Sequence, residues 1–157
     1  MEKQDGTKAI RVKNTKTQYN EHSTPVFLTS SFTFESAEDM RAAFADEVET
    51  TVYSRFVNPN YSELVNKMCA LEGTEAGYAT ATGMAAIFAS MVAVVGNGDH
   101  IVSCRSIFGA SHTMLTEVLP RFGITYTYVD VKATEAEWES AIQDNTKMIF
   151  LETPTNP

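Results

Sequence analysis

From residue 76 onward, the apolar positions of the chain change repeatedly between the period of a strand and that of a helix. Short apolar runs predict strands, at residues 76–81, 100–104, 125–131 and 148–152. Segments with helical periodicity lie between them, at residues 84–95, 111–122 and 134–142. This alternation favours an α/β fold in which helices cover both faces of a largely parallel sheet. Ligands of such sheets bind at the carboxyl ends of the strands.

The segment before residue 36 differs in character from the rest of the chain. Residues 1–35 contain many Ser, Thr, Asn and Lys and show no sustained helical period. We interpret them as an arm that becomes ordered only against another surface, such as a second subunit. The predicted organisation is an N-terminal arm and subunit-contact segment at residues 1–60, followed by the first part of a larger α/β domain at residues 61–157.

Capping residues predict where several helices begin and end. Ser36 and Asp39 resemble a capping box and predict a short helix after Ser36. Asn60 with Glu63 predicts the start of a second helix, and Gly73 its end. The apolar residues of the second helix share one face: Leu64, Met68 and Leu71. The same reasoning gives the later caps: Gly123 after the helix at 111–122, and Thr134 with Glu137 for the last helix.

Composition and charge exclude several classes of function. Of the 157 residues 43% are apolar, which is enough for one domain with a core. A net charge of -8 opposes binding to nucleic acid or to an anionic membrane surface. No secretory signal or membrane-spanning run is apparent, so a soluble cytoplasmic protein is expected. Cys69 and Cys104 are predicted to be reduced core thiols, and the scattered histidines predict no metal site.

The turn at Thr82 and Gly83 is the first candidate for a ligand site. A predicted strand passes through these residues directly into the apolar helix that begins at Met84. The start of a helix presents unpaired backbone N–H groups and a partial positive charge, which together bind anions. A Thr-Gly pair before a helix is more often only a cap, and the segment contains neither G-x-G-x-x-G nor a Walker lysine. A non-catalytic module that binds phosphate or a nucleotide here is an alternative.

Further candidate residues fall at the same edge of the predicted sheet, or on a segment that can reach it. Tyr53 and Arg55 lie two residues apart in an extended segment, so a phenol and a guanidinium can contact one phosphate. Phe108 follows a predicted strand, where a flat ring can cover a planar cofactor. Asn156 lies in a loop fixed by prolines after the last predicted strand, and its amide can donate to a ligand. Each alone is more simply an exposed loop residue or a core residue, but their convergence on one edge favours a site.

The order and spacing of several segments resemble one known family. These segments are TPVFLTSSF, YSRFVNPN, LEGTEAGYATATGMAA, GDHIVSCRSIFG, RFGITYTYVD and TKMIFLETPTNP. They resemble the transsulfuration (Cys/Met metabolism) family of pyridoxal-phosphate (PLP)-dependent enzymes. The resemblance implies PLP as the cofactor and an aspartate aminotransferase-like fold (fold type I), of which this chain would hold the arm and an incomplete, mostly parallel sheet. It also implies a homo-oligomer, usually a tetramer, whose active sites are shared between two subunits.

The resemblance assigns roles to the residues at the predicted phosphate site. The backbone of Gly83 and Met84, next to Thr82, is expected to hold the cofactor phosphate at the start of the helix. Tyr53 and Arg55 are expected to reach the same phosphate from the neighbouring subunit. The residues 61–157 would then be the first part of the large PLP-binding domain.

The resemblance also assigns residues to the cofactor ring. Phe108 is expected to stack on the pyridine ring, and Asn156 to hydrogen-bond its phenolic oxygen or the substrate carboxylate. The lysine that forms a Schiff base with the cofactor follows the NP motif in the family, so it is expected beyond Pro157. Lys132 follows a predicted strand but lies near acidic residues that favour its charged form, and the other lysines are placed no better. The isolated chain is therefore expected to be inactive.

The implied activity is a γ-replacement on a small amino-acid substrate, in which the pyridinium ring acts as an electron sink. Many family members have a tyrosine where this sequence has Phe108, and its hydroxyl is credited with proton transfer, notably in the γ-lyases. The RSIFG form is more similar to the O-succinylhomoserine sulfhydrylase branch, which makes homocysteine for methionine biosynthesis from an O-acylhomoserine and a sulfur donor. The alternatives are cystathionine γ-synthase, O-acetylhomoserine sulfhydrylase, and cystathionine or methionine γ-lyase.

Overall fold

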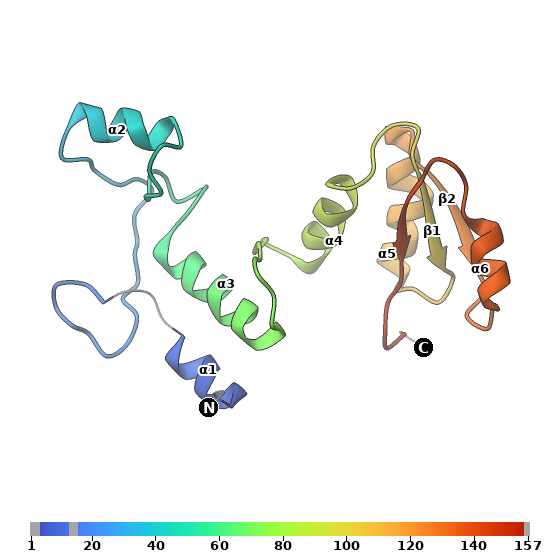
Figure 1. Cartoon of the computed structure of the whole chain (residues 1–157), viewed down its shortest axis with the longest axis horizontal. Helices are drawn as coiled ribbons and strands as arrows, with labels where there is room; N and C mark the ends of the chain where they lie inside the picture. Colours follow the sequence, from blue (N-terminus) through green and yellow to red (C-terminus); the bar gives the residue numbers. More distant parts are fainter. Residues whose placement is uncertain (1–3, 13–15, 156–157) are drawn as a thin grey trace. The chain divides into compact units, whose positions relative to one another are not determined.

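The computed structural model describes residues 4–12 and 16–155, which form two compact units (Figure 1). The first unit ends at Ala79 and the second begins at Thr80. The predicted boundary after residue 60 falls within the first unit, and as a boundary between arm and large domain it stays a prediction. Among the described residues, no helix has both the length and the apolar character needed to cross a membrane.

The first unit contains the helices α1, α2 and α3, which span Asp5–Arg11, Ala37–Phe44 and Pro59–Glu72. The prediction that residues 1–35 lack a helix is wrong, because α1 forms there. A helix this short is not stable by itself, and α1 lies in contact with α3. Asp5 in its first turn and Lys8 in its last turn also form an ion pair of 3.4 Å, with signs that suit the helix dipole.

Side-chain caps determine where α2 and α3 begin. Ser36 caps α2 and accepts a hydrogen bond from the N–H of Asp39, as predicted. The predicted cap of α3, Asn60, is wrong: Asn58 is the cap, and its side chain accepts from the N–H of Asn60 at 2.9 Å. The proline between them occupies the first turn, where its missing N–H has no cost. Gly73 ends α3 in the left-handed conformation with φ of 69°, as predicted.

The second unit is built on a parallel sheet in the order β2-β1-β3. Its strands are β1, β2 and β3, which span His100–Cys104, Thr125–Val129 and Thr146–Phe150. The central strand β1 matches the prediction and is buried along its whole length, which explains the apolar and small residues that follow His100. The outer strands overlap their predicted ranges, although β2 ends earlier and β3 begins earlier than expected.

The strand predicted at residues 76–81 is wrong. No strand is assigned to this fully described segment. Its backbone instead forms a hydrogen bond with a side chain: the N–H of Ala79 donates to the hydroxyl of Tyr61 at 3.0 Å. The apolar pattern that suggested a strand therefore marks an extended connection that no neighbouring strand accompanies.

The helical segments of the second unit are α4, α5, a π-helical turn η1, a 3₁₀ turn η2 and α6. They span Gly83–Val92, Gly109–Thr113, Met114–Val118, Leu119–Phe122 and Glu135–Ala141. The single helix predicted at 111–122 is thus a succession of different helical types. Pro120 lies in its last turn and cannot donate to a regular helical ladder. Gly123 ends the run with φ of 74°, and Thr134 with Glu137 forms the predicted capping box of α6.

A hydrophobic core joins the sheet of the second unit to its helices. Its buried members come from α4, β1, the helical run that follows and the loops beside these elements: Met91, Val95, Ile101, Ile107, Leu115, Leu119 and Ile124. Cys69 and Cys104 are both free thiols; Cys104 is buried as predicted, whereas Cys69 is half-buried. Because Ile107 belongs to this core, the chain is fixed immediately before Phe108.

Candidate active site

The first turn of α4 carries the predicted phosphate-binding residues. Thr82 is the N-cap, and its Oγ1 accepts a hydrogen bond from the N–H of Ala85 at 3.1 Å. The N–H of Ala86 donates to the carbonyl of Thr82, also at 3.1 Å. The N–H groups of Gly83 and Met84 precede these, in the turn where a helix has no acceptor for its own amides. Together with the helix dipole, they can bind an anion through the backbone.

The surroundings of Gly83 leave room for such an anion. A β-carbon built at Gly83 would meet no other atom within 4 Å. The first turn of α4, all of which is described, contains no acidic residue that would repel a phosphate. The Thr80 hydroxyl donates to the carbonyl of Thr82 at 2.8 Å and so holds the approach to the turn. The site can therefore accept a phosphate without a rearrangement of nearby side chains.

Phe108 lies where the chain passes from β1 into α5. It is the N-cap residue of α5, and the residue is 47% exposed. The core residue Ile107 precedes it, so the backbone is anchored while the ring is accessible. The predicted position after the carboxyl end of β1 is thus confirmed. Its predicted contact with a cofactor ring stays a prediction.

Glu152 is a residue of this region that the sequence analysis did not select. It follows β3, and its Oε2 accepts a hydrogen bond from the N–H of Phe108 at 2.7 Å. Its other oxygen, Oε1, accepts from the hydroxyl of Ser111. An acidic side chain just after a predicted strand, at the ligand-binding edge of a parallel sheet, was a signal for it. Glu152 ties the loop after β3 to the start of α5.

Phe108 and Glu152 lie at the carboxyl edge of the sheet of the second unit. β1 and β3 are parallel neighbours, so Phe108 and Glu152 follow them at the same edge. Figure 1 shows α4 running in the opposite direction to β1, so α4 begins at the end that corresponds to the carboxyl end of β1. The second unit therefore has an accessible aromatic ring at the carboxyl edge of its sheet and an anion site at the corresponding end of α4.

Tyr53 and Arg55 form a second group, within the first unit. The guanidinium carbon of Arg55 lies 5.4 Å from the centre of the Tyr53 ring. Between them, Ser54 holds the backbone: its N–H donates to the carbonyl of Ser30 at 2.9 Å, and its hydroxyl to that of Thr29 at 2.5 Å. The two predicted phosphate ligands thus stand next to each other, and the arginine is exposed.

Asn156 lies outside the described residues, so its predicted hydrogen bond to the cofactor or substrate stays a prediction. The structure brings Thr82, Gly83 and Met84 together at one helix start, and it pairs Tyr53 with Arg55 in the other unit. The roles of all these residues in cofactor binding are proposals that follow below.

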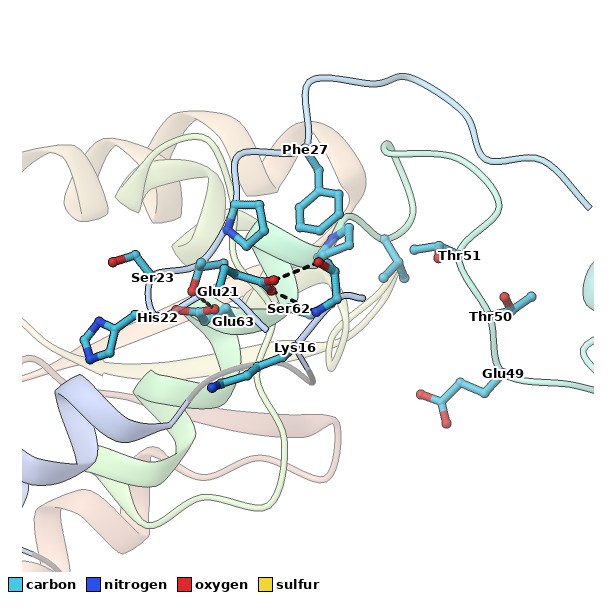
Figure 2. Close-up of a pocket in the computed structure, with 15 residues that line it drawn as sticks. Lys16, Glu21, His22, Ser23, Phe27, Glu49, Thr50, Thr51, Ser62 and Glu63 are labelled. Carbon is cyan, nitrogen blue, oxygen red and sulfur yellow. Dashed lines mark hydrogen bonds between the residues drawn. The ribbon is translucent and has the colours of Figure 1, made fainter. Parts of the chain in front are cut away.

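A cavity of about 550 Å³ lies in the first unit, among the N-terminal segment, α3 and the loop before it (Figure 2). None of the described residues that were predicted to bind the cofactor lines it. Two of its acidic residues already have partners: Thr17 donates twice to Glu21, which lowers the pKa of that carboxyl, and Glu63 pairs with Lys67 at 2.5 Å. We therefore regard the cavity as a feature of the N-terminal segment and separate from the candidate site.

Comparison with known proteins decides the family. Residues 6–157 match the family described as Cys/Met metabolism PLP-dependent enzyme. The chain belongs to this family. An O-succinylhomoserine sulfhydrylase of Pseudomonas aeruginosa is 40% identical over 151 residues, which cover 96% of this chain and 37% of that protein. An L-methionine gamma-lyase of Fusobacterium nucleatum is 39% identical over 152 residues, which cover 97% of this chain and 38% of that protein.

The solved structures of relatives agree with the predicted fold. A crystal structure from Campylobacter jejuni, assigned as an O-acetylhomoserine (thiol)-lyase with pyridoxyl-lysine monophosphate, matches with a TM-score of 0.91. The two are 28% identical, and the match covers 98% of this chain and 37% of that chain. The predictions of a PLP-dependent enzyme of fold type I and of PLP as the family's cofactor are confirmed. The chain spans about 37% of the length of these relatives.

The residues of this chain fit the phosphate end and the ring of PLP. The first turn of α4 suits a phosphate dianion, and Phe108 provides a flat, accessible surface. The described lysines do not fit the role of the Schiff-base residue: Lys8 pairs with Asp5 and Lys67 with Glu63, while the other three, Lys16, Lys132 and Lys147, are exposed. A nucleophilic lysine needs a desolvated or electropositive environment, which none of these five has.

Proposed function

We propose that the full-length protein is a PLP-dependent γ-replacement enzyme that acts on an O-acylhomoserine and gives homocysteine, as an O-succinylhomoserine sulfhydrylase does. The observation that carries the proposal is the pairing of the α4 anion site with Phe108 at the carboxyl edge of the sheet, in a chain of this family. The 40% identity to an O-succinylhomoserine sulfhydrylase supports the choice of branch.

In this proposal, each described residue has a binding or orienting role. The N–H groups of Gly83 and Met84 hold the phosphate, and Thr82 keeps the helix start in shape. Phe108 lies against the ring and keeps water from one of its faces. When bound, PLP supplies an electron sink for negative charge that develops on the substrate. Because the Schiff-base lysine is not among the described residues, the isolated chain is proposed to be inactive.

Phe108 bears on the kind of reaction. A phenylalanine ring packs against a planar group but has no hydroxyl that could give or take a proton. A replacement reaction can proceed with the incoming sulfur nucleophile, whereas an elimination that releases a thiol gains from a nearby proton donor. The 39% identity to an L-methionine gamma-lyase makes elimination the second candidate function.

Tyr53 and Arg55 are proposed to act in a neighbouring subunit of a homo-oligomer. Their side chains stand together, and Arg55 is exposed, so the pair is free to reach a phosphate outside its own unit. A guanidinium can bind two phosphate oxygens at once, and the phenol can donate to a third. An active site completed in this way requires at least a dimer.

The test is product analysis with the purified full-length protein. Incubated with O-succinylhomoserine and sulfide, the protein is expected to absorb visible light, release succinate and form homocysteine. With methionine alone it is expected to release little methanethiol. A colourless protein that releases neither succinate nor acetate from the O-acylhomoserines would rule out the proposal. Faster turnover of methionine than of either ester would favour the γ-lyase.

A further inference from the structure

Glu152 binds the start of α5 through both oxygens of its carboxylate. Oε2 accepts the N–H of Phe108 at 2.7 Å, and Oε1 accepts the hydroxyl of Ser111. Ser111 is fully buried, and Glu152 is half-buried. Hydrogen bonds to an ionised carboxylate are shorter and stronger than those between neutral groups. The contact therefore fixes two positions of the segment that begins at Phe108.

The other contacts of Phe108 explain why its hydrogen bond to Glu152 affects the position of its ring. Ile107 is 8% exposed and belongs to the core, so the chain is held on the preceding side. The carbonyl of Phe108 accepts the N–H of His112 at 2.9 Å, so the chain is held on the following side. Glu152 supplies the third contact, at the N–H of Phe108 itself. With the backbone fixed in this way, only the two side-chain torsions of Phe108 can move its ring.

We propose that Glu152 is a positioning residue, which sets the place of the Phe108 ring at the ligand-binding edge of the sheet. The inference rests on the proposed function, in which that ring lies against the cofactor. Glu152 acts through Phe108 and Ser111 and touches no reacting atom. A residue that only stabilised the fold would affect unfolding but leave the environment of the bound cofactor unchanged.

The experiment compares Glu152→Ala with Glu152→Gln in the full-length protein. Alanine removes both contacts. Glutamine can keep them, because its amide oxygen accepts from Phe108 and its NH₂ group donates to Ser111, whose hydroxyl accepts as well as donates. Glu139→Ala is the matched control, since Glu139 is an exposed glutamate of the second unit. The readouts are hydrogen exchange at the Phe108 amide, visible circular dichroism of bound PLP, cofactor content, and kcat and KM.

In Glu152→Ala, the Phe108 amide is expected to exchange about tenfold faster or more, because its acceptor is lost. Cofactor content is expected to persist, since the α4 turn holds the phosphate. The dichroism band should weaken, and kcat should fall by about tenfold to a hundredfold with a smaller change in KM, because a small misplacement of a ring disturbs the reacting geometry. Glu152→Gln should restore most of each property, and Glu139→Ala should match the parent protein.

Unchanged dichroism and kcat in a folded Glu152→Ala protein would overturn the inference, as would equal losses in the alanine and glutamine variants. If Glu152→Ala does not fold, Ser111→Ala replaces it: loss of one anchor should give smaller changes of the same kind, and no change would count against the inference. Failure of the parent protein to bind PLP would instead sink the proposed function, while hydrogen exchange would still report whether Glu152 anchors Phe108.

Discussion

The Nδ1 atom of His100 lies 2.8 Å from Oγ1 of Thr146, so side chains join the first residues of β1 and β3. The other ring nitrogen, Nε2, lies 2.9 Å from Oγ1 of Thr127 in β2 and 3.2 Å from the amide nitrogen of Gln143. An amide nitrogen only donates, so Nε2 accepts and Nδ1 carries the proton of a neutral ring. One buried imidazole thus connects all the strands of the sheet, at the edge opposite the candidate site.

This geometry predicts a pH dependence of stability. Burial lowers the pKa of His100 in the folded protein. In the unfolded chain the ring has its ordinary pKa of about 6.5, so on acidification the unfolded state binds a proton before the folded state does. The free energy of unfolding should therefore be unaffected by His100 above that pKa and should decrease as the pH falls below it.

Urea unfolding of the full-length protein at about pH 7.5 and about pH 5.5 measures this contribution. His100→Gln should be less stable than the parent at the higher pH but should lose less stability on acidification. His22→Gln, a change at an exposed histidine, is the control. The same loss on acidification in His100→Gln as in the parent would show that other groups cause it.

The cap of α4 should contribute to both stability and cofactor binding. Thr82→Ala removes the acceptor of the Ala85 N–H and should cost about 1 kcal/mol in the free energy of unfolding. Thr134→Ala removes the similar cap of α6 and should have a similar cost. Only Thr82→Ala should also weaken PLP binding, measured by fluorescence titration, because α6 is not at the proposed site. Equal PLP affinity in the two variants would contradict the assignment of the phosphate to α4.

Arg55 should determine cofactor affinity across subunits. Arg55→Ala should lower the affinity for PLP by about tenfold or more, since hydrogen bonds between a guanidinium and a phosphate are among the stronger ones. Arg55→Lys should recover only part of it, because an ammonium lacks the planar fork. Arg121→Ala, at an exposed arginine of the second unit, is the control.

Mixed oligomers test whether Arg55 acts in trans. At a PLP concentration too low to saturate Arg55→Ala, subunits with this change, mixed with subunits that lack the Schiff-base lysine, should show more activity than either parent alone. Such complementation requires a site built from two chains. Its absence in oligomers proven to be mixed would place Arg55 in the site of its own subunit.

Phe108→Tyr should shift the reaction toward elimination. The added hydroxyl provides a proton donor beside the proposed substrate, and a positioned acid contributes about a hundredfold or more to proton-transfer steps. The ratio of 2-oxobutyrate to homocysteine formed from O-succinylhomoserine and sulfide should therefore rise. Phe108→Leu keeps an apolar side chain without the flat ring, so it should lower both products without changing their ratio. An unchanged ratio in Phe108→Tyr would remove Phe108 as an explanation of specificity.

The sequence predicted those parts of the fold that depend on local chemistry. Ser36 and Thr134 were identified as caps because a cap needs only a hydroxyl followed at the right distance by an N–H donor. Gly73 and Gly123 were identified as helix ends because helices commonly end at a residue with positive φ, which glycine tolerates best. Both glycines adopt positive φ in the structure. β1 was identified because a strand that is buried on both faces consists mostly of apolar and small residues, as Ile101–Cys104 do.

The errors arose where contacts between distant residues decide the structure. α1 has a polar sequence and depends on contact with α3, which no local pattern reveals. Glu152 gains its role from Phe108, which lies 44 positions earlier in the chain. The same distinction applies to the candidate site. The α4 anion site could be predicted from three consecutive residues, whereas the contacts that anchor Phe108 could be identified only in the structure.

Two glycines allow stability and cofactor binding to be separated. Gly123 has φ of 74°, and a β-carbon there would lie 2.0 Å from Oδ1 of Asn97. Gly123→Ala should therefore destabilise the full-length protein by about 1 kcal/mol or more, because alanine is strained at positive φ even if Asn97 moves away. At Gly83 the backbone has ordinary φ and open space, so Gly83→Ala should change the free energy of unfolding of the cofactor-free protein by less than about 0.5 kcal/mol.

For cofactor affinity, Gly83→Ala should have the larger effect and Gly123→Ala the smaller one. The methyl group of Gly83→Ala would occupy space beside the amides that are proposed to contact the phosphate, and should weaken PLP binding by about tenfold. Gly123 ends the helical run before β2 and touches no proposed ligand, so Gly123→Ala should keep most of its PLP affinity once folded. Urea unfolding and PLP titration of both variants complete the comparison. If Gly83→Ala binds PLP as tightly as the parent protein, the phosphate does not rest against the first turn of α4.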